Sequence, residues 1–293
     1  MALHTFFFTA PEELARPPVG LEFKEVPHHD QFDATAAAAH AAACLRACDE
    51  VMGCCDAKRR EQLSLDGHVG VVFERSPYCH GKVQDRVCAV FAGEIAYWPG
   101  HDQVAEHHDA FVRGDPLPLE DDADWLVRFY ESFSGFASLD DITEAALHAL
   151  SRVHGSFAFV VYDSVAKRVW AARDAEGVQP LFWGVTDDNR LVFGTDANKV
   201  DGCNPTASPF PAGCLFASHD ATLCHSPGAR GWVIKGDHSL PGTLLSFLPS
   251  AKGTHSWRGV KAVPRMDAEG HICGAVYRVS SEAQLGNDEV RSH

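Results

Sequence analysis

The sequence of 293 residues lacks the features that would place it in several large classes of proteins. No apolar run reaches the roughly 18 residues that a membrane-spanning helix needs, so we expect no membrane association. Basic residues are in deficit, with 25 Lys and Arg against 40 Asp and Glu and a net charge of −15. Because nucleic acids attract the opposite charge, we expect no nucleic-acid partner. No G-x-G-x-x-G motif follows a predicted strand, which disfavours a dinucleotide-binding fold.

The ten cysteines are not arranged in the C-x-x-C pairs that are typical of zinc sites. Cys44 and Cys48 lie one helical turn apart, with Cys54 and Cys55 close behind, and a metal site there remains an alternative. We predict no metal and no cofactor. The first residues lack a basic stretch followed by an apolar one, so we expect no secretory signal. We therefore expect the protein in the cytoplasm, or also in the nucleus, with its cysteines reduced rather than joined in disulfides.

What is present is an order of strands, then helices, then strands. Helices are predicted for 34–51, 103–112, 125–134 and 142–153 from apolar periodicity. Strands are predicted for 3–9, 69–73, 87–92, 156–162, 168–173, 181–185, 190–193, 214–217 and 273–279. Short turns join the strand pairs, including a hairpin-like connection between 69–73 and 87–92, and favour antiparallel pairing. The pattern predicts an α+β layered protein rather than a βαβ protein.

The apolar fraction of 45% suffices for one full core. We predict a single domain over residues 1–280. Residues 219–265 are rich in Gly, Ser and Pro and are predicted to form an irregular insertion. Residues 281–293 are predicted to be a polar tail.

The most informative stretch is Gly155–Gly184, which reads GSFAFVVYDSVAKRVWAARDAEGVQPLFWG. It resembles class II glutamine amidotransferase domains, as in asparagine synthetase, where G-x-F-A-F and Y-D precede R-D-x-x-G-x-x-P-L. Three further segments follow the same family order, at Phe91–Ile95 (FAGEI), Asp121–Asp124 (DDAD) and Phe210–Gly213 (FPAG). The resemblance extends over about residues 1–218.

A narrower resemblance is to plant aluminium-induced and stem-specific proteins with YGL and LRDR motifs. Ala10–Leu14 (APEEL), Phe210–Cys214 (FPAGC) and Gly270–Val279 (GHICGAVYRV) are similar to segments of those proteins. Neither YGL nor LRDR occurs in this sequence. Both resemblances imply an N-terminal nucleophile hydrolase-like fold, a four-layer αββα sandwich of two mostly antiparallel sheets with helices outside.

The resemblance also implies where the catalytic groups would lie. In the enzymes, the nucleophile is a cysteine exposed behind the initiator methionine, with its own α-amine as the base. Ala2 occupies that position, and a methyl group cannot attack a carbonyl. In the enzymes, an Asn side chain and a Gly N–H stabilise the oxyanion, and here Ala92 replaces the Asn while Gly93 remains. We therefore predict no catalytic residues at this site.

Groups that would hold a substrate are better preserved. Asp122 matches the carboxylate that binds the substrate's α-amino group, and Arg75 matches the arginine that binds its α-carboxylate. With Gly93 and Glu94 they form the candidate ligand-binding set. For Asp122, the alternative is an acid that only stabilises a helix N-terminus. Cys79 and Cys88 lie near the expected pocket, and Cys88 is the preferred candidate for a relocated nucleophile.

The motif residues Arg173, Asp174, Gly177 and Pro180 are interpreted as a structural turn rather than a ligand contact. Together these features predict a catalytically inactive protein on the amidotransferase scaffold, acting as a stress-related regulatory, ligand-sensing or interaction module. Its expected ligand is glutamine or another small amino acid, and its expected partner is a second copy or another protein. The alternatives are an active amidohydrolase with a relocated nucleophile and an amidotransferase subunit of a separate synthetase.

Overall fold

The architecture was obtained from a computed structural model of the chain. The structure describes residues 5–11, 59–65, 69–97, 121–133, 139–166, 168–185, 190–197, 200, 208–218, 242–251, 256–266 and 272–281. The predicted helices 34–51 and 103–112, the tail 281–293 beyond residue 281, and the cysteines at 44–55 lie outside these residues. All statements of structure below concern the described part of the chain.

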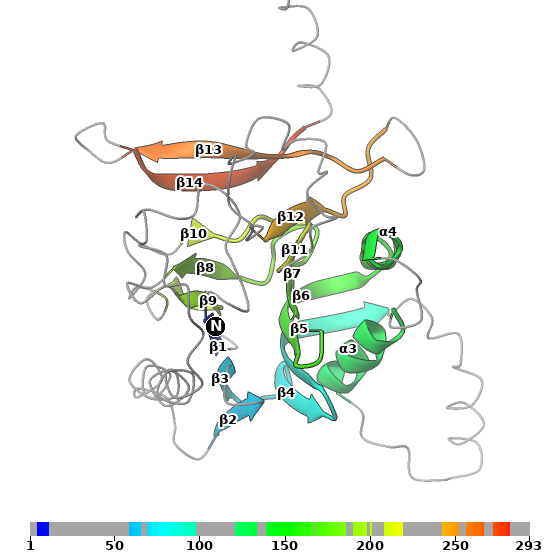
Figure 1. Cartoon of the computed structure of the whole chain (residues 1–293), viewed down its shortest axis with the longest axis vertical. Helices are drawn as coiled ribbons and strands as arrows, with labels where there is room; N and C mark the ends of the chain where they lie inside the picture. Colours follow the sequence, from blue (N-terminus) through cyan, green and yellow to red (C-terminus); the bar gives the residue numbers. More distant parts are fainter. Residues whose placement is uncertain are drawn as a thin grey trace, which may run out of the picture.

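Two antiparallel sheets of six strands each form the body of the protein (Figure 1). The first sheet has the order β10-β8-β9-β1-β3-β2, with strands Ser208–Pro209, Phe182–Val185, Arg190–Gly194, Phe6–Pro11, Val69–Glu74 and Arg60–Leu65. The second has the order β12-β11-β7-β6-β5-β4, with strands Thr243–Ser246, Cys214–Ala217, Arg168–Arg173, His154–Asp163, Val87–Tyr97 and Cys79–Gln84. A separate hairpin pairs β13 (Val260–Met266) with β14 (Ile272–Val279).

The alternation of side chains along β5 separates two buried clusters, because successive residues of a strand point to opposite faces. Cys88, Val90 and Ala92 belong to the inner cluster, which also contains Phe8 and Phe193 of the first sheet. The neighbouring β5 residues Val87, Ala89 and Phe91 belong to the outer cluster beneath the helices. The sandwich predicted from the sequence, with two antiparallel sheets face to face, is confirmed.

Helices α3 (Asp122–Glu131) and α4 (Leu139–Leu150) cover the outer face of the second sheet (Figure 1). Asp121 is the N-cap of α3, and its carboxylate accepts hydrogen bonds from the N–H groups of Ala123 and Asp124. The Asp124 carboxylate accepts in return from the N–H of Asp121, which completes a capping box. Within the described ranges, neither helix has the length and apolar character that crossing a bilayer requires.

Both helices begin and end three residues earlier than the sequence predicts. The cap at Asp121 determines the start of α3, because its side chain satisfies N–H groups that lack intrahelical partners. At the end of α4, Ser151 donates from its hydroxyl to the carbonyl of His148, and Ser151–Val153 form a turn instead of a further helical turn. Apolar periodicity alone does not register such capping interactions.

The predicted hairpin between 69–73 and 87–92 is wrong, because β3 and β5 belong to different sheets. β5 pairs instead with β4 (CHGKVQ), whose polar residues and glycine give a weak strand signal. Within the segment 219–265, the described residues include β12 and most of β13, and the irregular insertion as a whole stays a prediction. Both strands are poor sequence signals, the first for its four-residue length and the second for Pro264.

Candidate functional site

The candidate site lies where the start of β1 meets β3, β4 and β5. Ala2 is outside the described residues, and Thr5 directly precedes β1. The carbonyl of Thr5 accepts a hydrogen bond from the N–H of Glu74 at 2.9 Å and a weaker one from the Cys79 thiol at 3.7 Å. These contacts join the residue before β1 to the end of β3 and to the start of β4.

Ala92 is completely buried in the inner cluster, on the β5 strand between β4 and β6. It lies opposite Cys79 on one side and Ala158 on the other. A methyl group at this position neither donates nor accepts a hydrogen bond. The side chain therefore contributes only to packing between the sheets.

Gly93 has a conformation that favours glycine, with φ of +122°. A Cβ atom added to it would lie only 2.0 Å from the carbonyl oxygen of Ser156 on β6. Its N–H donates to the carbonyl of Tyr78 at 2.8 Å, within the turn that precedes β4. The close approach of β6 therefore requires glycine here for structural reasons, and its N–H already has an acceptor inside the protein.

Two of the candidate ligand-binding side chains are exposed to solvent. Glu94 follows Gly93 on β5 and is exposed. The Arg75 side chain is 61% exposed and pairs through Nη1 with Glu61 Oε1 at 2.9 Å. The hydrogen bond and charge of Glu61 raise the pKa of Arg75, which keeps the guanidinium fully charged. A substrate carboxylate would have to share this guanidinium with Glu61.

Asp122 is the first residue of α3 and is partly exposed beside the N-cap Asp121. Asp121 Oδ2 lies 3.2 Å from His80 Nδ1 on β4, and the other ring nitrogen of His80 lies 3.0 Å from the carbonyl oxygen of Pro77. Both nitrogens thus face acceptors, which favours the doubly protonated imidazolium. The hydrogen bond to Asp121 is the main cause that raises the pKa of His80.

The pKa of Asp121 reflects opposing influences. Burial raises it, but the hydrogen bonds from His80 and from the N–H groups at the start of α3 outweigh burial and lower it overall. The charge of Asp121 also acts on Arg75, so that Arg75, His80 and the start of α3 form one electrostatic neighbourhood. The structure therefore brings Arg75 and the Asp121–Asp122 pair into one region, although their spacing in the sequence is large.

The thiols that remain near the site are protonated at neutral pH. Burial raises the pKa of Cys88 to about 12 and that of Cys79 further still. Cys88 lies opposite Val83 and Tyr162, whereas Cys79 lies directly opposite Ala92. Of the two, Cys79 is therefore the one beside Ala92, whereas the sequence-based preference was Cys88. No group of three or more His, Cys, Asp or Glu among the described residues is arranged to hold a metal ion.

The R-D-x-x-G-x-x-P turn is held by its own hydrogen bonds. The guanidinium of Arg173 donates to three carbonyl oxygens, those of Gln179 at 2.7 Å, Phe210 at 2.9 Å and Gly177 at 2.6 Å. The Asp174 carboxylate accepts from three backbone N–H groups, those of Glu176, Val178 and Gln179. With Gly177 at a φ of +67°, these bonds fix the path of the chain before Pro180.

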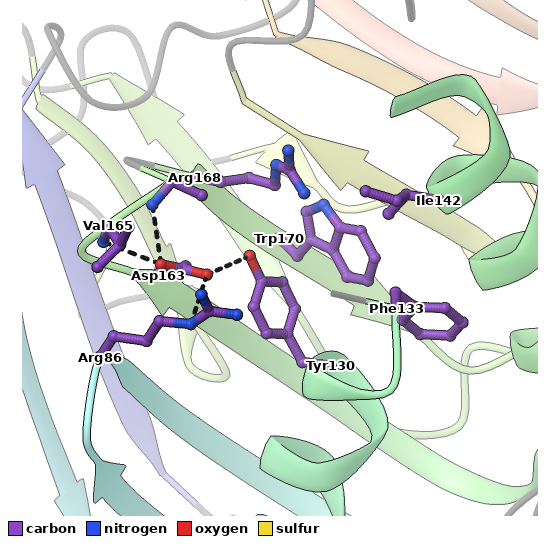
Figure 2. Close-up of a pocket in the computed structure, with 9 residues that line it drawn as sticks. Arg86, Tyr130, Phe133, Ile142, Asp163, Val165, Arg168 and Trp170 are labelled. Atoms are coloured by element: carbon purple, nitrogen blue, oxygen red, sulfur yellow. Dashed lines mark hydrogen bonds and ion pairs between the residues drawn. The ribbon is translucent and has the colours of Figure 1, made fainter. Parts of the chain in front are cut away.

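A second group of polar residues, which the sequence analysis did not single out as a site, surrounds Asp163 on the outer face of the second sheet (Figure 2). Asp163 is only 2% exposed and accepts hydrogen bonds from the hydroxyl of Tyr130 and from the N–H groups of Val165 and Ala166. Arg86 Nε lies 3.5 Å from Asp163 Oδ2. The Tyr162-Asp163 pair of the motif was the sequence signal for this group. The sequence does not predict that Arg86 and Tyr130 lie beside Asp163.

Comparisons with known proteins agree with the motif-based resemblance. Residues 138–227 match the model of a family described as "Aluminium induced protein". The chain is 39% identical over 64 residues to a probable asparagine synthetase of Dictyostelium discoideum, which covers 22% of this chain and 12% of that protein. It is also 39% identical over 56 residues to human asparagine synthetase, covering 19% of this chain and 10% of that protein.

Solved structures of similar arrangement share little sequence with the chain. Glutamine phosphoribosylpyrophosphate amidotransferase from B. subtilis gives a TM-score of 0.42 at 13% identity, over 83% of this chain and 49% of that one. A glutamine aminotransferase class-II domain protein from Silicibacter pomeroyi gives 0.39 at 12%, over 73% and 93%. The aligned part spans about a tenth of the length of the asparagine synthetases. The chain is thus similar to the glutamine-hydrolysing asparagine synthetases over a short segment, and its residues 138–227 match the aluminium-induced protein family.

Proposed function

We propose that this protein is a catalytically inactive member of the amidotransferase-like scaffold that acts as a ligand-sensing or interaction module in a stress-related regulatory role. The observation that carries the proposal is the state of the oxyanion position. Ala92 offers no donor, and the Gly93 N–H is hydrogen-bonded to the Tyr78 carbonyl. With Ala2 at the family's nucleophile position, the chain lacks the group that would form the acyl intermediate.

The proposed inactivity of the site rests on changes at more than one group. Removing one oxyanion donor typically lowers the rate about 10²–10³-fold, because the developing charge loses a positioned hydrogen bond. Here the side-chain donor is replaced and the backbone donor has an internal acceptor. The buried Cys79 thiol does not compensate, because its raised pKa leaves almost no thiolate.

The opposite charges of Arg75 and Asp122, which lie in one region, support the proposal that the site still binds a ligand. An amino acid presents an ammonium and a carboxylate, and these two side chains offer one charge of each opposite sign. Arg75 is engaged by Glu61, so the affinity expected for glutamine is weak, and the exposed ion pair costs little to rearrange. The proposed physiological role is therefore recognition of a small amino acid, localised to the cytoplasm, with a second copy or another protein receiving the signal.

The first experiment mixes carbon-labelled glutamine with the purified full-length protein and follows both glutamine and glutamate by NMR. We expect glutamine line broadening and no glutamate. Asp122→Asn is expected to abolish the broadening, whereas the matched control Glu176→Gln, in the turn after Asp174, is expected to leave it unchanged. Glutamate formation by the wild-type protein would overturn the proposal of an inactive site.

The same assay applied to Ala2→Cys/Ala92→Asn tests why the site is inactive. Mass spectrometry first establishes that the initiator methionine has been removed and that the cysteine is N-terminal. We expect at most weak glutamate release, because the Gly93 N–H keeps its bond to Tyr78. Release at the rate of an ordinary glutaminase would mean that the turn before β4 does not obstruct the oxyanion position.

A second candidate function is that of an amidotransferase subunit that acts with a separate synthetase. The segment 39% identical to asparagine synthetases favours it. It predicts a stable complex with a protein that carries nucleotide chemistry. Co-purification of such a partner, together with partner-dependent glutamine hydrolysis, would favour this candidate over the sensor.

A further inference from the structure

A cleft of about 180 Å³ opens on the outer face of the second sheet, between the end of α3 and the start of α4 (Figure 2). Tyr130 reaches it from α3, Phe133 from the turn that follows α3, and Ile142 from α4. Its walls belong to the outer cluster, whereas Ala92 and Cys79 belong to the inner cluster. The cleft is therefore separated from the candidate site by the sheet itself.

Three aromatic rings form part of the apolar wall of the cleft, beside Ile142 and Val165. The rings of Tyr130 and Trp170 meet edge to face at a centroid distance of 5.0 Å, and Phe133 lies 5.9 Å from Trp170. All three side chains are less than 10% exposed and packed against their neighbours. The edge-to-face contact of Tyr130 with Trp170 is a favourable ring geometry, and the parts of the three rings that stay exposed line the cleft.

The floor of the cleft is the buried carboxylate of Asp163, and its acceptor capacity is largely used within the protein. Oδ1 accepts from two N–H groups of the β6–β7 turn, at 2.9 Å each. Oδ2 accepts from the Tyr130 hydroxyl at 3.1 Å and faces Arg86 Nε at 3.5 Å. Asp163 therefore organises the cleft and leaves little capacity to bind a cation.

Two guanidinium groups border the same cleft, against this single carboxylate. Arg86 is 37% exposed and faces Asp163 through Nε. Arg168 lies two residues before Trp170 on β7, so both side chains point to the same face of the sheet, and Figure 2 shows Arg168 extending toward Trp170. The charged residues that line the cleft therefore carry a net positive charge, in a chain whose total charge is −15.

We propose that this cleft binds a small aromatic carboxylate. The ring lies against Trp170, Tyr130 and Phe133, and the carboxylate is held by the guanidinium groups of Arg168 and Arg86. Guanidinium donors match a carboxylate in geometry and form charge-assisted hydrogen bonds. A volume of about 180 Å³ is below the range of about 300–1,000 Å³ typical of drug-sized ligands. The ligand is therefore a compact, single-ring acid.

The test uses benzoate and phenylacetate as probes, with benzyl alcohol and benzylamine as neutral and cationic analogues of similar size. Saturation-transfer NMR with the full chain is expected to show saturable binding of the two acids. The two analogues are expected to bind at least about tenfold more weakly, because they lack the charge-assisted hydrogen bonds. Equal binding of all four compounds, or no binding of the acids, would overturn the proposal.

Arg168→Gln is expected to lower the affinity for benzoate at least about tenfold, and Arg168→Lys to restore part of it, because the charge returns without the planar fork. The matched control is Arg278→Gln, which removes an exposed arginine of β14 that does not line the cleft, and it is expected to leave benzoate binding unchanged. Benzoate binding that is insensitive to Arg168→Gln in a folded variant would also overturn the proposal. Because Asp122 does not line this cleft, the result of the benzoate experiment is independent of glutamine binding at the candidate site.

Discussion

The two faces of the second sheet have opposite characters. On the inner face, Ala92 and Cys79 fill the candidate site with buried side chains, and the Gly93 N–H is bonded to the Tyr78 carbonyl. On the outer face, the cleft around Asp163 is open and lined by aromatic rings and guanidinium groups. The comparison teaches that a motif can persist for packing reasons on one face while chemically versatile groups gather on the other.

Gly93 shows most clearly how packing alone can maintain a motif residue. Both Gly93 on β5 and Gly155 on the adjacent β6 have positive φ, and a Cβ on either would approach a carbonyl oxygen of the other strand to 2.3 Å or less. The close approach of β5 and β6 thus requires a glycine on each strand. The glycine of the FAGEI segment is therefore not evidence of catalysis.

The largest effect expected is that of Gly93→Ala, which tests the structural side of the comparison. The added methyl group would clash with the Ser156 carbonyl and adopt a strained φ, so we expect the free energy of unfolding to fall by about 3–5 kcal/mol. Urea denaturation followed by circular dichroism measures it. Gly259→Ala is the matched control, because its Cβ would meet only Ser280 Oγ at 3.6 Å and should change stability little. Near-equal stability of the two variants would contradict the packing explanation.

Arg173→Met should have the next largest effect, because it leaves three backbone carbonyls without their donor. We expect a loss of about 2–4 kcal/mol in the same denaturation experiment, with glutamine broadening changed only in proportion to unfolding. Glu176→Gln, in the same turn, serves as the control. A variant of normal stability that no longer binds glutamine would instead assign Arg173 a ligand contact.

The smallest effect expected concerns the pH dependence of the His80–Asp121 pair, which borders the inner site. The pKa of His80 is raised above its ordinary 6.5. The contribution of its charged form to folding stability is therefore complete below pH 6.5 and is lost as the pH rises through the pKa of the folded state. The pKa of Asp121 is lowered from 3.8, so its contribution is present above that pH and lost as the pH falls. The pair is therefore most stabilising between about pH 4 and 6.5.

His80→Gln should remove about 1 kcal/mol or less of stability at pH 6 and a smaller amount at pH 8.5, measured by urea denaturation at both values. The partly buried position of both side chains keeps the effect small but measurable. The variant of an exposed histidine on β6, His154→Gln, provides the control. An equal loss for His80→Gln at both pH values would mean that the imidazole acts through packing rather than charge.

The core strands and the turn chemistry were predictable from the sequence. β7 and β11 lie at the predicted residues because their apolar runs are short, continuous and bounded by turn residues. Asp121 and Asp122 were expected at a helix start, and the capping box explains why two acidic residues occur there. β4 was missed because its Gly, Lys and Gln residues do not produce an apolar strand pattern.

By itself, the sequence determined the α+β class, the antiparallel pairing and an alanine at position 2, since each depends on local residue type and order. Only the tertiary structure decided that Cys79 rather than Cys88 lies beside Ala92, that the Gly93 N–H is occupied, and that Arg86, Tyr130 and Arg168 meet around Asp163. These relations depend on strand register and on which face each side chain takes. A shift of one residue in register would change the cross-strand partners and would move each side chain of the strand to the other face. Local sequence patterns do not encode the pairing between distant strands.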